Sequence, residues 1–149
     1  MALRVQPSEP EEAMEEPLLV WLTRRRWIRS DTLVVRELPW HGRRVDVATL
    51  TKTGIATAYE LKLHHTRRVL EQSSLNGLSF DRSCIVTASR PSQENLGQAV
   101  ALGLGILLVN LVTNQVDLLL RPVLQDVGPT VRLRLRRKIE SGAGRTYVR

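Results

Sequence analysis

The residues of this chain best suited to chemistry are two carboxylates and a lysine, Asp46, Glu60 and Lys62, within the stretch GRRVDVATLTKTGIATAYELKL. Residues 52–54 (Lys-Thr-Gly) are typical of a three-residue hairpin loop with the glycine in the left-handed conformation. That loop places Asp46 opposite Glu60 on the two flanking strands. Because side chains alternate across a strand, Lys62 is expected on the same face as both carboxylates.

The same register places four large apolar residues together on the opposite, core-facing side: Val45, Val47, Tyr59 and Leu61. Two opposed carboxylates repel each other, which favours a raised pKa or a bound cation. Mg²⁺ binds through one or two carboxylates and keeps positions for a phosphate oxygen and a water molecule, and the Lys62 ammonium could orient that water. The alternative is a solvated sheet face on which Glu60 and Lys62 form a surface ion pair worth about 0–1 kcal/mol.

Asp46 followed by Glu60-Leu61-Lys62 inside a strand resembles the core of the PD-(D/E)-x-K nuclease superfamily, over about residues 31–111. Val45 stands where the proline of that name would be. The resemblance implies that Asp46, Glu60 and the backbone carbonyl of Leu61 bind Mg²⁺, for which Mn²⁺ can substitute, and that Lys62 is the catalytic lysine. It also implies two further catalytic residues: Gln72 on the helix after the motif, and Glu37, which is preferred over Glu12 and Glu16.

The elements expected around this motif form one α/β domain over residues 1–149, restriction-endonuclease-like, with a three-layer core in which helices flank a mixed β-sheet. Strands are expected at 32–38, 43–51, 55–63, 83–88, 106–111 and 116–120, and a four-residue turn at 39–42 would let Glu37 reach the site diagonally. Helices are expected from Pro17 through Trp27, after a capping box of Ser8 and Glu11, and from the caps Thr66 and Ser92. The acidic segment 1–16 and the tail 138–149 are expected to be loose.

Positive charge is the main compositional feature: the net charge is +7, carried by nineteen arginines and three lysines. Such a balance favours an anionic partner, most commonly nucleic acid. Two arginine groups could contact phosphates: Arg24, Arg25 and Arg26 at the end of the first helix, and Arg132, Arg134 and Arg136, which alternate with apolar residues in an expected strand. Compensation of the helix dipole and charge protection of a sheet edge are the respective alternatives.

The pattern predicts a Mg²⁺-dependent nuclease that hydrolyses phosphodiester bonds of nucleic acid, DNA in preference to RNA, through a metal-activated water. A non-catalytic nucleic-acid-binding module of the same fold is the alternative, and a basic protein without a nucleic-acid role is a third. The one cysteine, Cys84, excludes an intramolecular disulfide and favours a cytoplasmic location. The longest apolar stretch, 99–109, is shorter than the ~20 residues of a membrane span, so no membrane partner is expected. A homodimer is compatible with the sequence.

Overall fold

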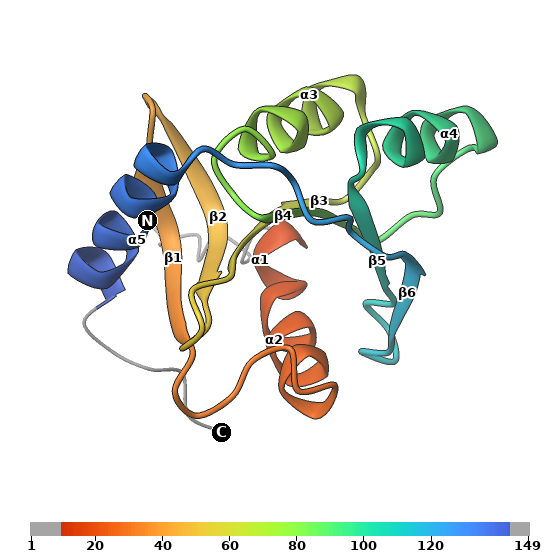
Figure 1. Cartoon of the computed structure of the whole chain (residues 1–149). Helices are drawn as coiled ribbons and strands as arrows, with labels where there is room; N and C mark the ends of the chain where they lie inside the picture. The colour runs from red at the N-terminus through yellow and green to blue at the C-terminus, as the bar shows by residue number, and fades with distance from the viewer. Residues whose placement is uncertain (1–9, 144–149) are drawn as a thin grey trace, which may run out of the picture.

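The computed structural model describes residues 10–143, which form five helices and six strands (Figure 1). In chain order these are α1 (Pro10–Ala13), α2 (Glu15–Arg24), β1 (Leu33–Trp40), β2 (Arg43–Leu50), β3 (Ala56–Lys62), α3 (Arg67–Asn76), β4 (Arg82–Thr87), α4 (Gln93–Leu102), β5 (Gly105–Val109), β6 (Val116–Leu120) and α5 (Pro129–Ala143).

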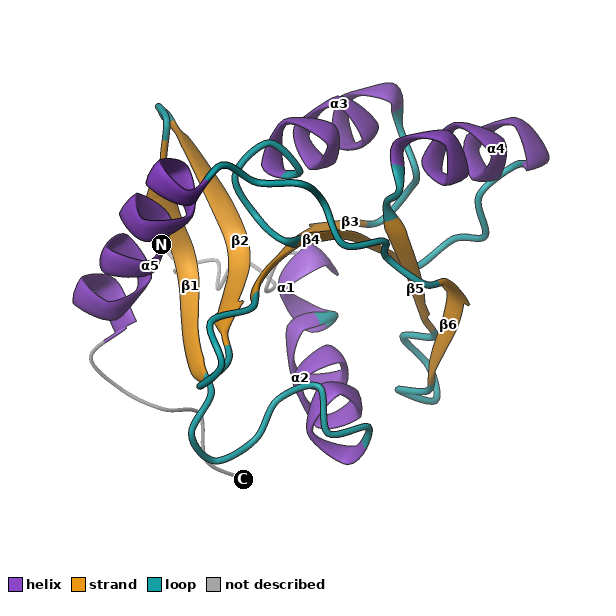
Figure 2. Cartoon of the chain, in the orientation of Figure 1, coloured by secondary structure: helices purple, strands orange, loops and turns teal. Residues whose placement is uncertain are grey.

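The six strands form one mixed sheet in sequence order, as Figure 2 shows. β1, β2 and β3 are antiparallel, β4 and β5 run parallel to β3, and β6 is antiparallel to β5. The parallel pairs are joined through α3 and α4, because a parallel connection needs a crossover segment. This arrangement confirms the expected α/β class and the order of its elements.

Strand pairing determines which residues face each helical layer. Tyr59 pairs with Cys84, and both pack in the core beneath α2. Ala58 and Glu60, one position away on either side, face the opposite layer, where α3, α4 and α5 cover the sheet. The molecule therefore has the expected three layers. No helix among residues 10–143 is long and apolar enough to cross a membrane.

Helix ends follow the predicted capping residues in the middle of the chain. The Thr66 hydroxyl accepts a hydrogen bond from the Val69 amide at 3.3 Å, and the Ser92 hydroxyl accepts one from the Asn95 amide at 3.1 Å. Gly103 ends α4 in the left-handed conformation, with φ at 70°. These caps supply partners for backbone groups that a helix end leaves unpaired.

Both ends of the chain differ from expectation. α2 already ends at Arg24, so Trp27 lies in the following loop, and Pro17 is the third residue of the helix. Residues 10–13 and 15–16 are helical and Met14 is fully buried, while residues 138–143 belong to α5, so these parts are ordered into helices. Ser8 of the expected capping box lies outside the described residues.

The expected basic strand at 131–136 is wrong, because this segment lies within α5. Val131, Leu135 and Ile139 recur every fourth residue and pack against β1 and β2, which a helix permits and a strand does not. Pro129 at the first helical position gives the helix a favourable start. The alternation of arginines with apolar residues therefore does not correspond to a strand in the structure. The alternative, in which these arginines protect a sheet edge, is wrong for the same reason.

Candidate active site

The β2–β3 hairpin has the predicted register from its loop as far as the pair of Val47 and Tyr59. The loop has three residues, its Gly54 has φ of 93°, and the Thr51 amide donates to the Ile55 carbonyl at 2.9 Å. The register pairs Val47 with Tyr59, and Asp46 is the next residue of β2. At this residue the side chain, and not the backbone, bonds to β3: Asp46 Oδ2 accepts a hydrogen bond from the Leu61 amide at 2.8 Å. The carboxylate is thereby fixed beside the following residues of β3.

The side chains of β2 on either side of Asp46 pack on different faces of the sheet. Val47, Tyr59 and Leu61 pack beneath α2 as expected, but Val45 packs with Leu38 and the other residues under α5. The expected single face of four apolar residues is therefore wrong for Val45. Two residues apart on a regular strand share a face, so the backbone around Asp46 is irregular, and this irregularity directs the carboxylate toward β3.

Glu60 is buried, with 3% of its surface exposed, so the alternative of a solvated face is wrong for this residue. The Asn76 side-chain amide donates to Glu60 Oε1 at 3.0 Å. Burial, followed by the negative charge of Asp46, raises the pKa of Glu60 to about 8. At neutral pH Glu60 is therefore mainly protonated and can donate to Asp46. Lys62 makes no ion pair with Glu60 in the part of the chain that the structure describes.

Asn76 and Arg43 are members of this site that the sequence reasoning missed. Arg43 Nη1 donates to Asn76 Oδ1 at 3.1 Å and to the Gln72 carbonyl at 3.5 Å. Arg43 thus orients Asn76, whose amide nitrogen is bound to Glu60. Asn76 precedes Gly77, and this pair of residues is typical of a helix end, so nothing in the sequence assigned Asn76 to the site. Asn76 also lies one turn after Gln72 on the same face of α3.

Gln72 itself approaches the site only in part. Its backbone carbonyl accepts the bond from Arg43, while its side-chain Oε1 is buried and has no hydrogen-bond partner. Because α3 runs back antiparallel to β3, Gln72 lies one helical turn from Asn76 toward the carboxyl end of β3, the end that carries Lys62. The expected catalytic glutamine lies on α3, and Asn76 is the residue of this helix that contacts Glu60.

Asp46 and Lys62 line one cavity of about 350 Å³, together with Glu11, Glu12, Glu15, Arg36, Glu37 and Leu61. The cavity lies between the α1–α2 segment and the three neighbouring strands β1, β2 and β3. Five carboxylates and two cations surround it, and Arg36 and Glu15 form an ion pair there. The opening is therefore negative as it stands, which favours a cation over a phosphate.

Glu37 reaches this cavity by a different route from the one expected. The β1–β2 turn contains two residues, His41 and Gly42, both with positive φ, and the expected four-residue turn is wrong. The register then places Glu37 across from Asp46 and not diagonally. Its carboxylate is 69% exposed and lies 3.9 Å from Arg44.

Among the described residues, no group of three or more histidine, cysteine, aspartate or glutamate side chains is arranged to hold a metal ion.

The arginines expected to bind nucleic acid do not form two surfaces. Arg25 stacks over Trp21 at 5.2 Å from the ring centroid, and Arg26 lines a separate cavity. On α5, Arg132 forms an ion pair with the buried Asp81 at 2.7 Å, and Arg136 packs on Gly54. These two side chains make contacts within the protein, and the expected strand face on which Arg132, Arg134 and Arg136 would lie together is replaced by the helix α5. Phosphate binding by these arginines stays a prediction. Arg24, Arg25, Arg26 and Arg134 are exposed, whereas Arg132 and Arg136 are half-buried.

Comparison with known proteins supports the fold. No protein-family model matches the chain, and neither does any curated protein. The structure is similar to that of SPO1766, a protein of unknown function from Silicibacter pomeroyi, with a TM-score of 0.62 and 18% identity over 95% of this chain and 89% of that one. A repair endonuclease from Pyrococcus abyssi matches with a TM-score of 0.46 and 20% identity over 70% of this chain and 48% of that one. The first similarity establishes the fold, so the activity has to be inferred from the residues.

Proposed function

We propose that this protein is a metal-dependent nuclease that hydrolyses phosphodiester bonds, in DNA rather than RNA. The observation that carries the proposal is the pair of Asp46 and Glu60 on neighbouring strands, held together by contacts that do not neutralise them. One carboxylate is fixed by a backbone amide and the other by an asparagine amide. A pair of this kind is unfavourable without a proton or a cation, and the raised pKa of Glu60 expresses that cost.

The donor set fits a hard divalent cation such as Mg²⁺. The carboxylates of Asp46 and Glu60, with the backbone carbonyl of Leu61, would hold it, and oxygen ligands of this type suit Mg²⁺ or Mn²⁺. Each carboxylate uses one oxygen for the fixing hydrogen bond and retains a second. When bound, the cation would supply Lewis-acid chemistry, which lowers the pKa of water and polarises a phosphoryl oxygen.

Lys62 lines the cavity of about 350 Å³ that Asp46 also lines. The other cation of this cavity, Arg36, is paired with Glu15. Lys62 follows Glu60 by two residues on β3, and its side chain makes no hydrogen bond or ion pair with another residue of the described range 10–143. Glu60 itself is buried on the α3 side and is not among the residues that line the cavity. A free ammonium group at the mouth of such a site can hold a phosphate oxygen and orient a water molecule at the phosphorus. We assign that role to Lys62.

Asn76 and Arg43 act on the site through Glu60. The chain of hydrogen bonds from Arg43 to Asn76 to Glu60 fixes the direction of the Glu60 carboxyl group. Outer residues of this kind orient ligands and set their affinity for metal. They are positioning residues, because neither would contact the substrate.

The test is a divalent-metal titration with linear, nicked, branched and single-stranded DNA and matched RNA substrates. We expect cleavage in Mg²⁺ or Mn²⁺, and a loss of several orders of magnitude in Asp46→Ala and Lys62→Ala. Asp117→Ala is the matched control, because this exposed carboxylate on β6 lies outside the cavity. If no substrate is cut in either metal, while DNA still binds equally with and without chelator, the protein is a binding module.

A further inference from the structure

A second cavity, of about 420 Å³, lies at the amino-terminal end of β3 and shares no lining residue with the carboxylate site. Its walls are the loop after α2, the β2–β3 turn and the first residues of β3 and β4: Arg26, Trp27, Arg29, Asp31, Thr32, Thr51, Lys52, Thr53, Ile55, Thr57, Tyr59 and Arg82. Thr57 precedes Glu60 by three residues, so the two sites are separated by about 10 Å along the strand. This size is typical of a small-molecule site and exceeds what a bare phosphate ion needs.

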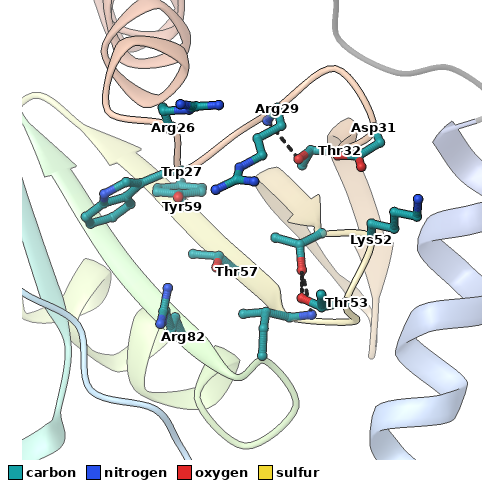
Figure 3. A pocket seen from close by; sticks show the side chains of 12 residues that line it. Arg26, Trp27, Arg29, Asp31, Thr32, Lys52, Thr53, Thr57, Tyr59 and Arg82 are labelled. Carbon is teal, nitrogen blue, oxygen red and sulfur yellow. Dashed lines mark hydrogen bonds between the residues drawn. The ribbon is translucent and has the colours of Figure 1, made fainter.

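The charges of this cavity are opposite to those of the carboxylate site. Four cationic side chains and one carboxylate line it. Figure 3 shows Arg29 reaching toward Tyr59 and away from Asp31, and Arg82 on the other side of Thr57, while Lys52 extends away from them. Three guanidinium groups, those of Arg26, Arg29 and Arg82, therefore border one space.

None of these three guanidinium groups has a hydrogen bond or ion pair with another residue between 10 and 143. By contrast, the half-buried Arg132, whose side chain is 42% exposed, forms an ion pair with Asp81 at 2.7 Å. Arg82 is half-buried at the start of β4 and has no such partner. Arg26 and Arg29 are exposed and border the same cavity. With four cations and one carboxylate around it, the cavity is net positive, and that charge favours an anionic ligand.

Hydroxyl groups and an aromatic ring complete the walls. Thr57 and Tyr59 present side chains to the cavity, and burial raises the pKa of Tyr59 well above its usual value, so its hydroxyl stays protonated and can donate. Trp27 is held in place by an edge-to-face contact with Trp21, with ring centroids 5.1 Å apart. A rigid aromatic wall beside arginines is suited to a planar base.

The backbone is shaped to present these groups. Arg26 adopts the left-handed conformation, with φ of 60°, which a residue other than glycine rarely adopts. The Trp27 and Ile28 amides both donate to the Leu22 carbonyl, and the Arg29 amide donates to the Thr32 hydroxyl at 2.9 Å. The loop is thus tightly folded, and its strained residue lies on the cavity wall, as strained residues at ligand sites often do.

We propose that this cavity binds the phosphate of a nucleotide, with Arg26, Arg29 and Arg82 on the phosphate and Trp27 against the base. The ligand is either a free nucleotide or the terminal nucleotide of a strand. The second source rests on the proposed nuclease function, whereas the first does not.

The test is calorimetric titration of the full-length protein with AMP, adenosine, inorganic phosphate, and a short DNA strand with or without a 5′-phosphate. We expect AMP to bind more tightly than either adenosine or phosphate. Arg29→Glu, in an exposed loop, and Arg82→Gln should each weaken AMP binding by roughly tenfold or more. Trp27→Ala should weaken AMP binding more than phosphate binding. Arg137→Ala is the matched control, because Arg137 is exposed on α5 and outside the cavity.

Asp46→Ala should leave AMP binding unchanged, which separates this site from the nuclease proposal. A preference for the 5′-phosphorylated strand over AMP would identify the strand end as the source, and equal binding of both strands with tight AMP binding would identify the free nucleotide. The proposal is overturned if AMP binds no better than adenosine, or if folded Arg29→Glu and Arg82→Gln proteins bind AMP as the wild type does.

Discussion

The raised pKa of Glu60 predicts how the stability of the metal-free protein depends on pH. The pKa is about 8 in the folded protein and 4.5 in the unfolded reference. Between these values the folded state binds the proton and the unfolded state does not, so the free energy of unfolding falls as pH rises through this range. The contribution of Glu60 to this free energy is largest below about pH 4.5 and is lost above about pH 8.

The structure sets the size of the effect. A shift from 4.5 to about 8 corresponds to a loss of at most about 5 kcal/mol from this group. That loss is comparable with the whole stability of a marginal domain, ~5–15 kcal/mol. Glu60→Gln keeps the shape and the hydrogen-bonding capacity of the protonated group and removes the titration. This variant should therefore match the wild type near pH 5 and be more stable than the wild type near pH 9.

The assay is urea unfolding in chelator, followed by tryptophan fluorescence at several pH values. Glu71→Gln is the control, since Glu71 is an exposed carboxylate on α3 whose contact with Arg67 is at the surface, and it should retain the wild-type pH dependence. Identical pH dependence in wild type and Glu60→Gln would refute the reasoning. It would mean that Glu60 is ionised in the folded protein at little cost.

Three further predictions follow from named contacts. Asn76→Ala should raise the Mg²⁺ concentration needed for half-maximal cleavage by roughly 10–100-fold, and an unchanged metal dependence would remove Asn76 from its positioning role. Asp81→Ala should lower the free energy of unfolding by about 3–5 kcal/mol in urea, because it leaves Arg132 without its partner, whereas Arg134→Ala should change it by less than about 0.5 kcal/mol. In fluorescence anisotropy, DNA should bind weakly in chelator and more tightly in Ca²⁺, which should not support cleavage. Asp46→Ala should lose the Ca²⁺ effect, and indifference of the wild type to Ca²⁺ would contradict the charge argument.

The hairpin register could be predicted because local rules determine it. Gly54 can adopt positive φ at low cost, and the three-residue loop then fixes every pair along β2 and β3 up to Val47 and Tyr59. The facing of Val45 could not be predicted in the same way. Alternation assumes a regular strand, and the strands are irregular where Asp46 accepts the hydrogen bond from Leu61 and where Glu37 on β1 has a positive φ of 51°.

The burial of Glu60 is a tertiary effect that the sequence pattern conceals. Acidic residues on a strand are usually solvated, and nothing local distinguishes this one. Its cover is α3, which supplies Asn76, while Arg43 reaches the same asparagine from β2. Only the packing of three separate elements brings these residues together, so a search by spacing along the chain finds the carboxylates and misses their support.

The α5 segment shows how two periodicities compete in one sequence. Val131, Leu133 and Leu135 alternate as in a strand, whereas Val131, Leu135 and Ile139 repeat as in a helix. Leucine and arginine both favour helices, and Leu133 is the residue left exposed when the helix forms. A longer window that included Ile139 and Pro129 would have favoured the helix.

Anomalous diffraction from crystals of the wild-type protein grown or soaked with Mn²⁺ would locate the metal ion that the proposed nuclease site requires. The account predicts an anomalous peak between the carboxylates of Asp46 and Glu60, within coordination distance of the Leu61 carbonyl, and its loss in Asp46→Ala crystals. A saturating soak that leaves this position without a peak, or a peak that persists in Asp46→Ala, would contradict it.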